Sequence, residues 1–220
     1  ILLVAIGGRL IPGYTGATLT SIRPPRRLAL EFTSILSLVL AAAAHASDHA
    51  LTAGLFLFTA ALAESLRMIT WRPWATRHIP LLWILHLGYG WLIGALALRA
   101  IASLSPSMLP ASAALHALTV GAIGSLTIGM MTRLTLIHTR QPVSADPAAI
   151  AAFVSIQLAA VIRVFGPVAY PAGADLSYLT AALLWSTAFV LWLVRHAPLL
   201  VTQPTALDRS ACKPAGQARE

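Results

Sequence analysis

The sequence is poor in the residues that soluble domains depend on. Only 10% of its 220 residues are charged, and Cys212 is the one cysteine. Soluble domains carry about 25% charged residues, so this composition argues against a soluble fold. A single cysteine excludes an internal disulfide framework, and the attachment sequence of c-type haem is absent. Walker, G-x-G-x-x-G, HExxH and Ser/His/Asp patterns are absent too, so nothing supports nucleotide hydrolysis or hydrolase chemistry.

Long apolar segments dominate the sequence instead. Hydrophobic residues make up 58% of the chain, and the mean hydropathy is +0.79. The apolar segments cover residues 28–46, 50–69, 79–102, 110–136, 147–165 and 176–194. Each is close to the roughly 20 residues that a helix needs to cross a bilayer. We therefore predict an all-α fold, a polytopic transmembrane helix bundle with about six spanning helices.

The polar stretches divide the chain around this bundle. We expect residues 1–27 to contain the end of a preceding helix, over 1–6, and then a cytoplasmic loop rich in glycine, proline and arginine. Residues 28–194 are expected to form the six-helix transmembrane domain. Residues 195–220 are expected to form a polar cytoplasmic tail.

The basic residues predict the orientation in the membrane. If the loop before the first span is cytoplasmic, only Arg99 and Arg163 of the 15 Lys and Arg fall on the other side. This asymmetry follows the positive-inside rule and places both ends of the sequence in the cytoplasm. The net charge of +8 is then loop charge, so we expect membrane lipids and no nucleic acid as partners. We also expect the sequence to continue a longer protein, whose N-terminal half would be a further partner.

Among the apolar segments, the stretch Leu115–Gln141 contains the most polar residues. Its glycines and hydroxyl residues would let a neighbouring helix approach closely in a membrane. It also contains Arg133, His116 and His138, and ionisable residues inside a span are costly enough to suggest function. In one continuous α-helix, the two histidines would lie about 33 Å apart and differ by about 40° in direction. One helix face would then carry a histidine near each membrane surface.

The seven histidines are the candidate metal ligands, since imidazole binds haem iron, copper and zinc. His86 lies about two turns inside the third segment, where Gly90 and Gly94 are expected to form a close-packing pair. For His86 and His116, a ligand or proton-handling role and the role of a hydrogen-bonded packing histidine stay equally open. Two histidines closer to the membrane surfaces complete the candidates: His49 and His138.

Five charged residues lie in or beside the spans. Glu64 and Arg67 are one turn apart and can pair, which favours a neutralised interfacial pair over a proton path. Glu31 lies toward the same membrane surface. Arg133 can reach toward the headgroups or hold a buried anion such as a haem propionate, since guanidinium suits carboxylates. Arg9, in a Gly-Gly-Arg sequence, invites the same interpretation.

Three motifs in order resemble the NnrS family of bacterial membrane proteins. They are GGRLIPGYT (7–15), HIPLLWILHLGYGWL (78–92) and LHALTVGAIGSLTIGMMTRLTLIHT (115–139). The resemblance covers nearly the whole chain, as about the C-terminal half of a family member. It implies a haem- and copper-containing protein of the bacterial inner membrane, linked to denitrification and to protection from nitric oxide and nitrosative stress. The expected cofactors are b-type haem and copper.

The resemblance and the residue chemistry select the same positions. We expect cofactor binding by His86, His116, Arg9 and Arg133, and metal ligation by His86, His116, His138 and His49. The family usually has glycine at the positions of Ile137 and Arg140, so the backbone beside His138 is where this sequence departs from the pattern.

Two functions from different classes remain open. One is a haem and copper membrane protein of nitric oxide metabolism or tolerance. The alternative is a proton-coupled transporter or sensor-like scaffold without a redox centre, in which histidines, Glu31 and Glu64 handle protons or bind a small solute. A purely structural partner of another membrane complex is a third possibility. His86 and His116 differ in depth by about 13 Å from helix rise, so we expect them to belong to separate sites.

Overall fold

The computed structural model describes residues 1–21, 24–105 and 107–201, and all regular structure there is helical. The α-helices are α1 (Leu2–Thr18), α2 (Leu28–Ala46), α3 (Ala50–Thr70), α4 (Pro80–Leu104), α5 (Ala111–His116), α6 (Gly124–His138), α7 (Pro147–Ala169) and α8 (Ala174–Val201). Two short 3-10 turns cover Pro73–Thr76 and Pro171–Gly173, and a π-helical segment, Ala117–Ile123, joins α5 to α6. Six stretches are long and apolar enough to cross a membrane, which confirms the predicted all-α polytopic fold.

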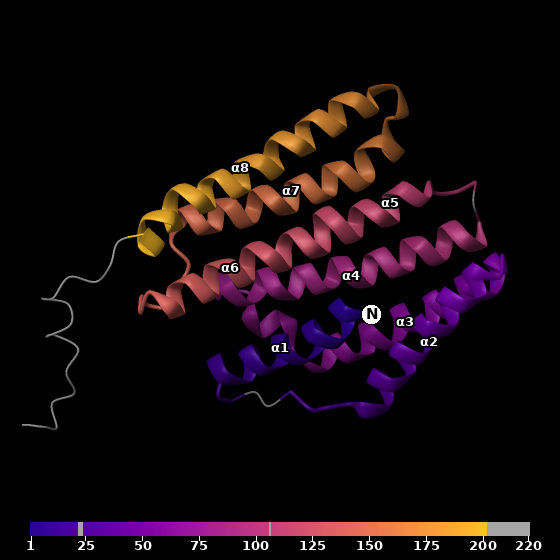
Figure 1. Ribbon diagram of the computed structural model, residues 1–220, viewed down its shortest axis with the longest axis horizontal. Helices are drawn as coiled ribbons and strands as arrows, with labels where there is room; N and C mark the ends of the chain where they lie inside the picture. Colours follow the sequence, from indigo (N-terminus) through magenta and orange to yellow (C-terminus); the bar gives the residue numbers. More distant parts are fainter. Residues whose placement is uncertain (22–23, 106, 202–220) are drawn as a thin grey trace, which may run out of the picture.

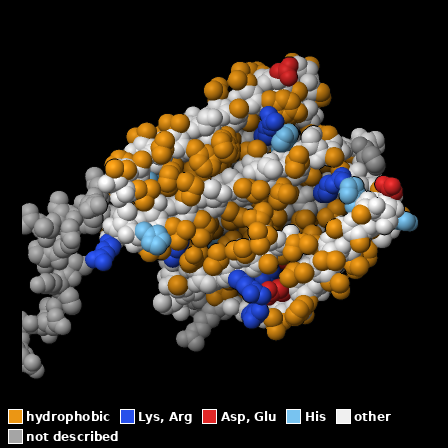
Figure 2. All heavy atoms as spheres, in the orientation of Figure 1, with side chains coloured by type: hydrophobic (Ala, Val, Ile, Leu, Met, Phe, Trp, Pro, Cys, Tyr) orange, Lys and Arg blue, Asp and Glu red, His pale blue; other side chains and the backbone are white. Residues whose placement is uncertain are grey.

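The helices lie side by side along a common direction, with α4 in the middle of the bundle (Figure 1). α4 contacts α1, α3, α5 and α6, while α2 packs on α3 at one flank and α7 on α8 at the other. Four side chains of its first turns are almost completely buried: Leu81, Leu82, Ile84 and Leu85. The visible outer surface is mainly apolar, as expected where a protein faces lipid rather than water (Figure 2). The element that organises the bundle is therefore α4.

The N-terminal polar stretch is helical over much of its length, which corrects the expectation of a loop over residues 7–27. α1 continues to Thr18 with Pro12 inside it, and only the residues after it leave the helix. Gly8 is required where it stands, because a Cβ there would lie 2.4 Å from the Arg67 side chain. Glycine and proline are loop signals in an isolated sequence. Here contacts with α4 hold the segment in a helix, and such contacts between distant residues could not be predicted from the local sequence.

The other end of the bundle is also longer than predicted. α8 runs to Val201, beyond the expected boundary at residue 194. An apolar Pro-Leu-Leu-Val stretch follows Arg195 and His196 and continues the helix. The predicted tail, with Cys212, otherwise lies outside the described residues.

The fourth span is not one regular α-helix. The π-helical segment starts directly after His116 and changes the number of residues per turn. The calculated agreement in direction between His116 and His138 therefore does not hold, since it assumed 3.6 residues per turn throughout. π-helical turns are frequent at functional sites, and this one gives His116 a different face from the rest of the span.

Close helix approach occurs at glycines of the fourth span, but not at Gly90 and Gly94. A Cβ on Gly121 would lie 2.6 Å from the Trp91 ring, and one on Gly129 would lie 2.9 Å from Ile84. The small residues of the fourth span thus let α4 come close, as predicted. No described atom lies within 4 Å of a Cβ built on Gly90 or Gly94, so the expected close-packing role of this pair is wrong.

Candidate functional site

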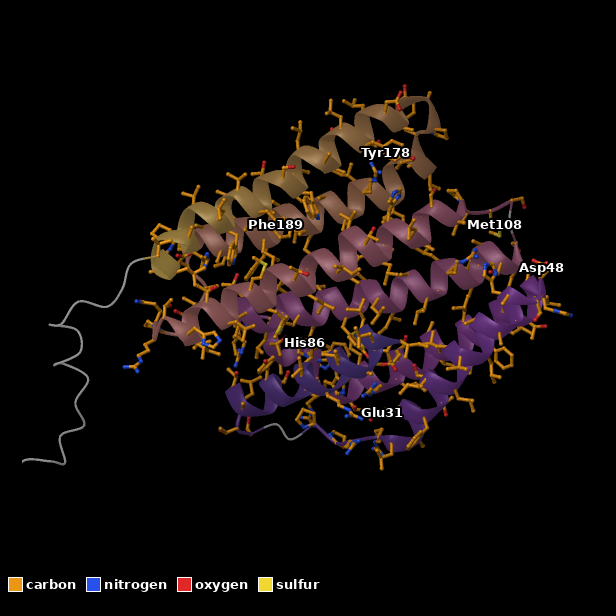
Figure 3. The ribbon with its side chains drawn as sticks, in the orientation of Figure 1. Glu31, Asp48, His86, Met108, Tyr178 and Phe189 are labelled. Carbon is orange, nitrogen blue, oxygen red and sulfur yellow. The ribbon has the colours of Figure 1, made fainter. Side chains whose placement is uncertain are left out.

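His86 lies on α4 (Figure 3), and its ring contacts Thr15 of α1. The residue is only 4% exposed. Its Nδ1 is 3.0 Å from the carbonyl oxygen of Leu82, which identifies Nδ1 as the protonated nitrogen that donates to this carbonyl. Nε2 is then the nitrogen with the lone pair, 3.5 Å from the Thr15 hydroxyl oxygen.

Thr15 offers His86 only a long hydrogen bond. Its hydroxyl hydrogen has two acceptors, the carbonyl oxygen of Ile11 at 2.9 Å and His86 Nε2 at 3.5 Å, and the shorter contact is the one to Ile11. A histidine fixed through Nδ1–H to a backbone carbonyl, with Nε2 available, has the geometry of a metal ligand. His86 is therefore able to coordinate a metal ion without breaking an existing short hydrogen bond.

Arg133 of α6 lies close to α1, the helix that also carries Thr15. Its guanidinium carbon lies 4.3 Å from the ring centroid of Tyr14, the neighbour of Thr15. Its Nε is buried and has no hydrogen-bond partner among the described residues. An unpaired buried donor costs about 1–3 kcal/mol, and more if charged. The arrangement suits a carboxylate placed against this guanidinium.

A pocket of about 340 Å³ opens beside the His86 ring. It is bordered by apolar side chains of α3 and α4, with Arg77 at the polar end. Gly90 belongs to this lining, and no described atom lies within 4 Å of a Cβ built there. The absence of a side chain at Gly90 therefore leaves the pocket open instead of bringing two helices together.

A buried network of charges lies on the other side of Trp71. Arg67 Nη1 is 3.3 Å from Glu64 Oε1, which confirms the predicted pairing, and Nη2 is 3.5 Å from Glu31 Oε2. Arg67 also donates to the carbonyl oxygen of Gly8, at 2.9 Å. Glu64 is completely buried, so the pair lies inside the bundle and not at the interface.

Two aromatic residues of this site were missed by the sequence analysis. The Tyr89 hydroxyl donates to Glu64, and the Tyr89 and Trp71 ring centroids are 4.9 Å apart. Trp71 also meets the His86 ring edge-on at 6.4 Å, so it links the network to the histidine. The spacing of His86 and Tyr89, three residues apart on one helix, was the available signal. Trp71 itself is almost fully buried.

His116 belongs to a separate site near α7 and α8. Arg163 Nη2 lies 3.2 Å from His116 Nε2, and the Arg163 guanidinium lies 4.1 Å from the centroid of Tyr178 (Figure 3). Since arginine can only donate, the Nε2 lone pair of His116 accepts this bond. His116 and Arg163 border a pocket of about 350 Å³ that shares no lining residue with the His86 pocket.

Comparison with protein families identifies the family to which the chain is related. The family described as NnrS protein matches residues 1–203, which include every described helix. The chain belongs to the NnrS family. No curated protein and no solved structure matches it.

The remaining histidine candidates of this NnrS family member stand apart from His86. His49 precedes the first residue of α3 and is exposed, and His138 is the exposed last residue of α6. Among the residues that the structure describes, no three His, Cys, Asp or Glu are grouped so that they could hold a metal ion. Of the predicted cofactor residues, the fold brings His86 and Arg133 to adjacent positions of α1 and places His116 elsewhere.

The turn after α6 contains an unusual backbone conformation. Arg140 has a φ of 56°, in the left-handed region that favours glycine. It is one of the two positions at which the resemblance described above led us to expect glycine.

Proposed function

We propose that this chain is an integral membrane haem protein of nitric oxide metabolism or tolerance, with His86 as a ligand of the iron. The observation that carries the proposal is the His86 ring, whose Nδ1 is fixed to Leu82 at 3.0 Å while Nε2 has only the long 3.5 Å contact with the Thr15 hydroxyl. A b-type haem needs such a nitrogen and no covalent attachment. When bound, its iron supplies a centre that takes up small ligands such as nitric oxide.

Arg133 would hold a haem propionate in this proposal. Its buried Nε has no partner among the described residues, and it lies over Tyr14, next to the Thr15 that faces His86. Arg9, the other predicted charge partner, already binds Glu31 with Nη2 at 3.2 Å. The proposal therefore depends on Arg133 and not on Arg9.

The described residues do not fit a copper site. A copper ion at His116 Nε2 would meet the Arg163 guanidinium that now occupies this lone pair, and like charges repel. His49 and His138 are exposed and are not grouped with other ligands. Copper binding by His116 therefore requires that Arg163 moves away and that further ligands come from outside the described residues.

The proposal is tested by the optical spectrum and haem content of the detergent-purified protein. His86→Ala is expected to lose or shift the Soret band, because the iron loses its nitrogen ligand. Gly90→Leu is expected to lower the haem content, because the new side chain would extend into the pocket beside His86. His138→Ala is the control, since this histidine is exposed and does not line the pocket. A His86→Ala protein with the spectrum and haem content of the wild type would disprove the assignment.

A proton-coupled transporter or sensor is the alternative, and one observation favours it. The buried network runs from the exposed Arg9 through Glu31, Arg67 and Glu64 to Tyr89 without interruption. A folded wild-type protein with neither haem nor metal, in which Glu64→Gln abolishes proton uptake into vesicles, would establish this alternative instead.

A further inference from the structure

A third pocket, with a charged lining, lies at the end of the bundle where the chain passes from α1 into α2. Its volume is about 340 Å³, and it is distinct from the pockets beside His86 and His116. Its charged lining consists of Arg9, Arg26, Arg27, Arg67 and Glu31. Figure 2 shows basic and acidic side chains gathered at this place on an otherwise apolar face.

The guanidinium groups outnumber the carboxylate that they share. Arg9 Nη2 is 3.2 Å from Glu31, Arg26 Nε is 3.7 Å away, and Arg67 Nη2 is 3.5 Å away. A carboxylate has two oxygens, whereas each guanidinium has five N–H donors. Since Glu31 cannot use all of these donors, the pocket has an excess of positive charge and of hydrogen-bond donors.

The exposure of the arginines shows where an anion could bind. The side chains of Arg9 and Arg26 are 65% and 66% exposed, while Glu31 beneath them is 5% exposed. The carboxylate is thus covered by guanidinium groups that still reach the outside. A ligand arriving at the pocket meets Arg9 and Arg26 first, and not Glu31.

The position along the chain places this pocket at the level of lipid headgroups. Arg26 and Arg27 directly precede α2, whose first residue, Leu28, begins an apolar span. Basic pockets between transmembrane helices on the cytoplasmic side are suited to anionic lipid headgroups. Guanidinium binds phosphate through two parallel hydrogen bonds, which favours a phosphate over a less charged polar group.

We propose that this pocket binds the phosphate group of an anionic membrane lipid, with Arg9 and Arg26 as its first contacts. A free phosphate ion offers the same oxygens and is the other possible source. The proposal does not depend on haem, because neither His86 nor Arg133 lines this pocket.

The test measures lipid binding to the purified full-length protein by native mass spectrometry. The probes are short-chain phosphatidylglycerol, short-chain phosphatidylcholine and inorganic phosphate. Phosphatidylglycerol is expected to bind most tightly. Arg26→Gln is expected to weaken its binding about tenfold, since a hydrogen bond to a charged group is lost. Arg72→Gln is the matched control, because it removes the same charge from an exposed arginine that does not line the pocket.

Two outcomes would overturn the proposal. If inorganic phosphate binds as tightly as phosphatidylglycerol and depends equally on Arg26, the ligand is a free phosphate and the lipid assignment is wrong. If phosphatidylglycerol binds equally to the wild type and to Arg26→Gln, the pocket is not the binding site. A colourless protein would reject the haem proposal but leave this result unaffected, since the readout is the mass of the bound lipid.

Discussion

Arg67 is the residue that connects the first four long helices of the bundle. From α3 it binds Gly8 of α1 and Glu31 of α2, and Glu64 links it to Tyr89 of α4. A charge this deeply buried is tolerated only when it is paired and hydrogen-bonded. Its three partners, Gly8, Glu31 and Glu64, meet that requirement, which explains why so polar a group lies inside an apolar bundle.

Glu64→Gln is expected to destabilise the protein by about 3 kcal/mol. Breaking a buried pair costs about 3–5 kcal/mol, and the remaining Glu31 keeps the loss at the lower end. The measurement is thermal unfolding in detergent. The double variant Glu64→Gln with Arg67→Gln serves as the control, because it removes both charges and should recover part of the loss. An unchanged unfolding temperature for the single variant would show that the pair adds nothing to stability.

The single residues of the site were predictable only in part. His86 and Arg133 could be selected from the sequence because an ionisable side chain inside a span is unusual wherever it points. The engagement of His116 by Arg163 could not be predicted, since the two are 47 residues apart and depend on how α5 packs against α7. Tyr89 was missed because a tyrosine in a membrane helix has many ordinary roles.

Among the helices, glycine has opposite roles at different positions. Gly121 lets Trp91 of α4 pack against the π-helical segment, and Trp91 Nε1 then donates to Gln157 of α7 at 2.8 Å. Gln157 in turn donates to Ser125 Oγ at 2.6 Å, so three spans are joined around this point. Gly94, on the same helix as Trp91, has open space around it.

Alanine substitution separates these two roles. Gly121→Ala is expected to lower the unfolding temperature, because a Cβ 2.6 Å from the Trp91 ring forces that ring away from Gln157. Gly94→Ala is expected to leave stability unchanged or to raise it by up to about 1 kcal/mol, since alanine favours the helix. Both variants are compared by thermal unfolding under the same conditions. Equal effects at the two positions would contradict the packing assigned to Gly121.

Asp146 connects α7 and α8 at one end of this helix pair. Its carboxylate accepts from the Ala149 amide at 2.8 Å, which caps α7, and it pairs with Arg195 of α8. Burial alone would raise the pKa of this carboxyl, but the Ala149 hydrogen bond and the Arg195 charge outweigh it and lower the pKa below its ordinary value. A carboxyl whose pKa is lowered by folding stabilises the protein above its unfolded-state pKa, and this stabilisation is lost as the pH falls through the folded-state value.

Asp146→Asn is therefore expected to lower stability at neutral pH and to lose its effect in acid. Asparagine also caps helices, so the loss at pH 7 reflects the ion pair and should be about 0.2–1 kcal/mol. The difference from the wild type should narrow as the pH is lowered from 5 toward 3. Asp146→Ala, which removes the cap as well, should cost about 0.5–2 kcal/mol more. Unfolding temperatures that differ by the same amount at both pH values would exclude this role of the charge.

At the scale of the whole molecule, hydropathy determined most of what could be predicted. Each apolar segment of about 20 residues became a spanning helix, because a lipid-exposed backbone must satisfy its hydrogen bonds within the helix. The helical structure of α1 could not be predicted from hydropathy, because contacts with α4 and with Arg67 hold its glycines and proline in a helix. The pockets beside His116 and beside the start of α2 could not be predicted either, because each is bordered by residues from segments that are distant in the sequence.

The orientation of the bundle is the remaining prediction at this scale. The positive-inside rule places the turn between α3 and α4 in the cytoplasm and the connection between α4 and α5 on the opposite side. Trp74 and Met108 are 63% and 70% exposed in these two connections, so each can carry a reporter cysteine. In a Cys212→Ser background, a membrane-impermeant maleimide should label Met108→Cys in right-side-out vesicles and Trp74→Cys only in inside-out ones. The reverse pattern would invert the topology, and it would then place the arginine pocket beside α2 at the outer leaflet, because that pocket lies at the same end of the bundle as Trp74.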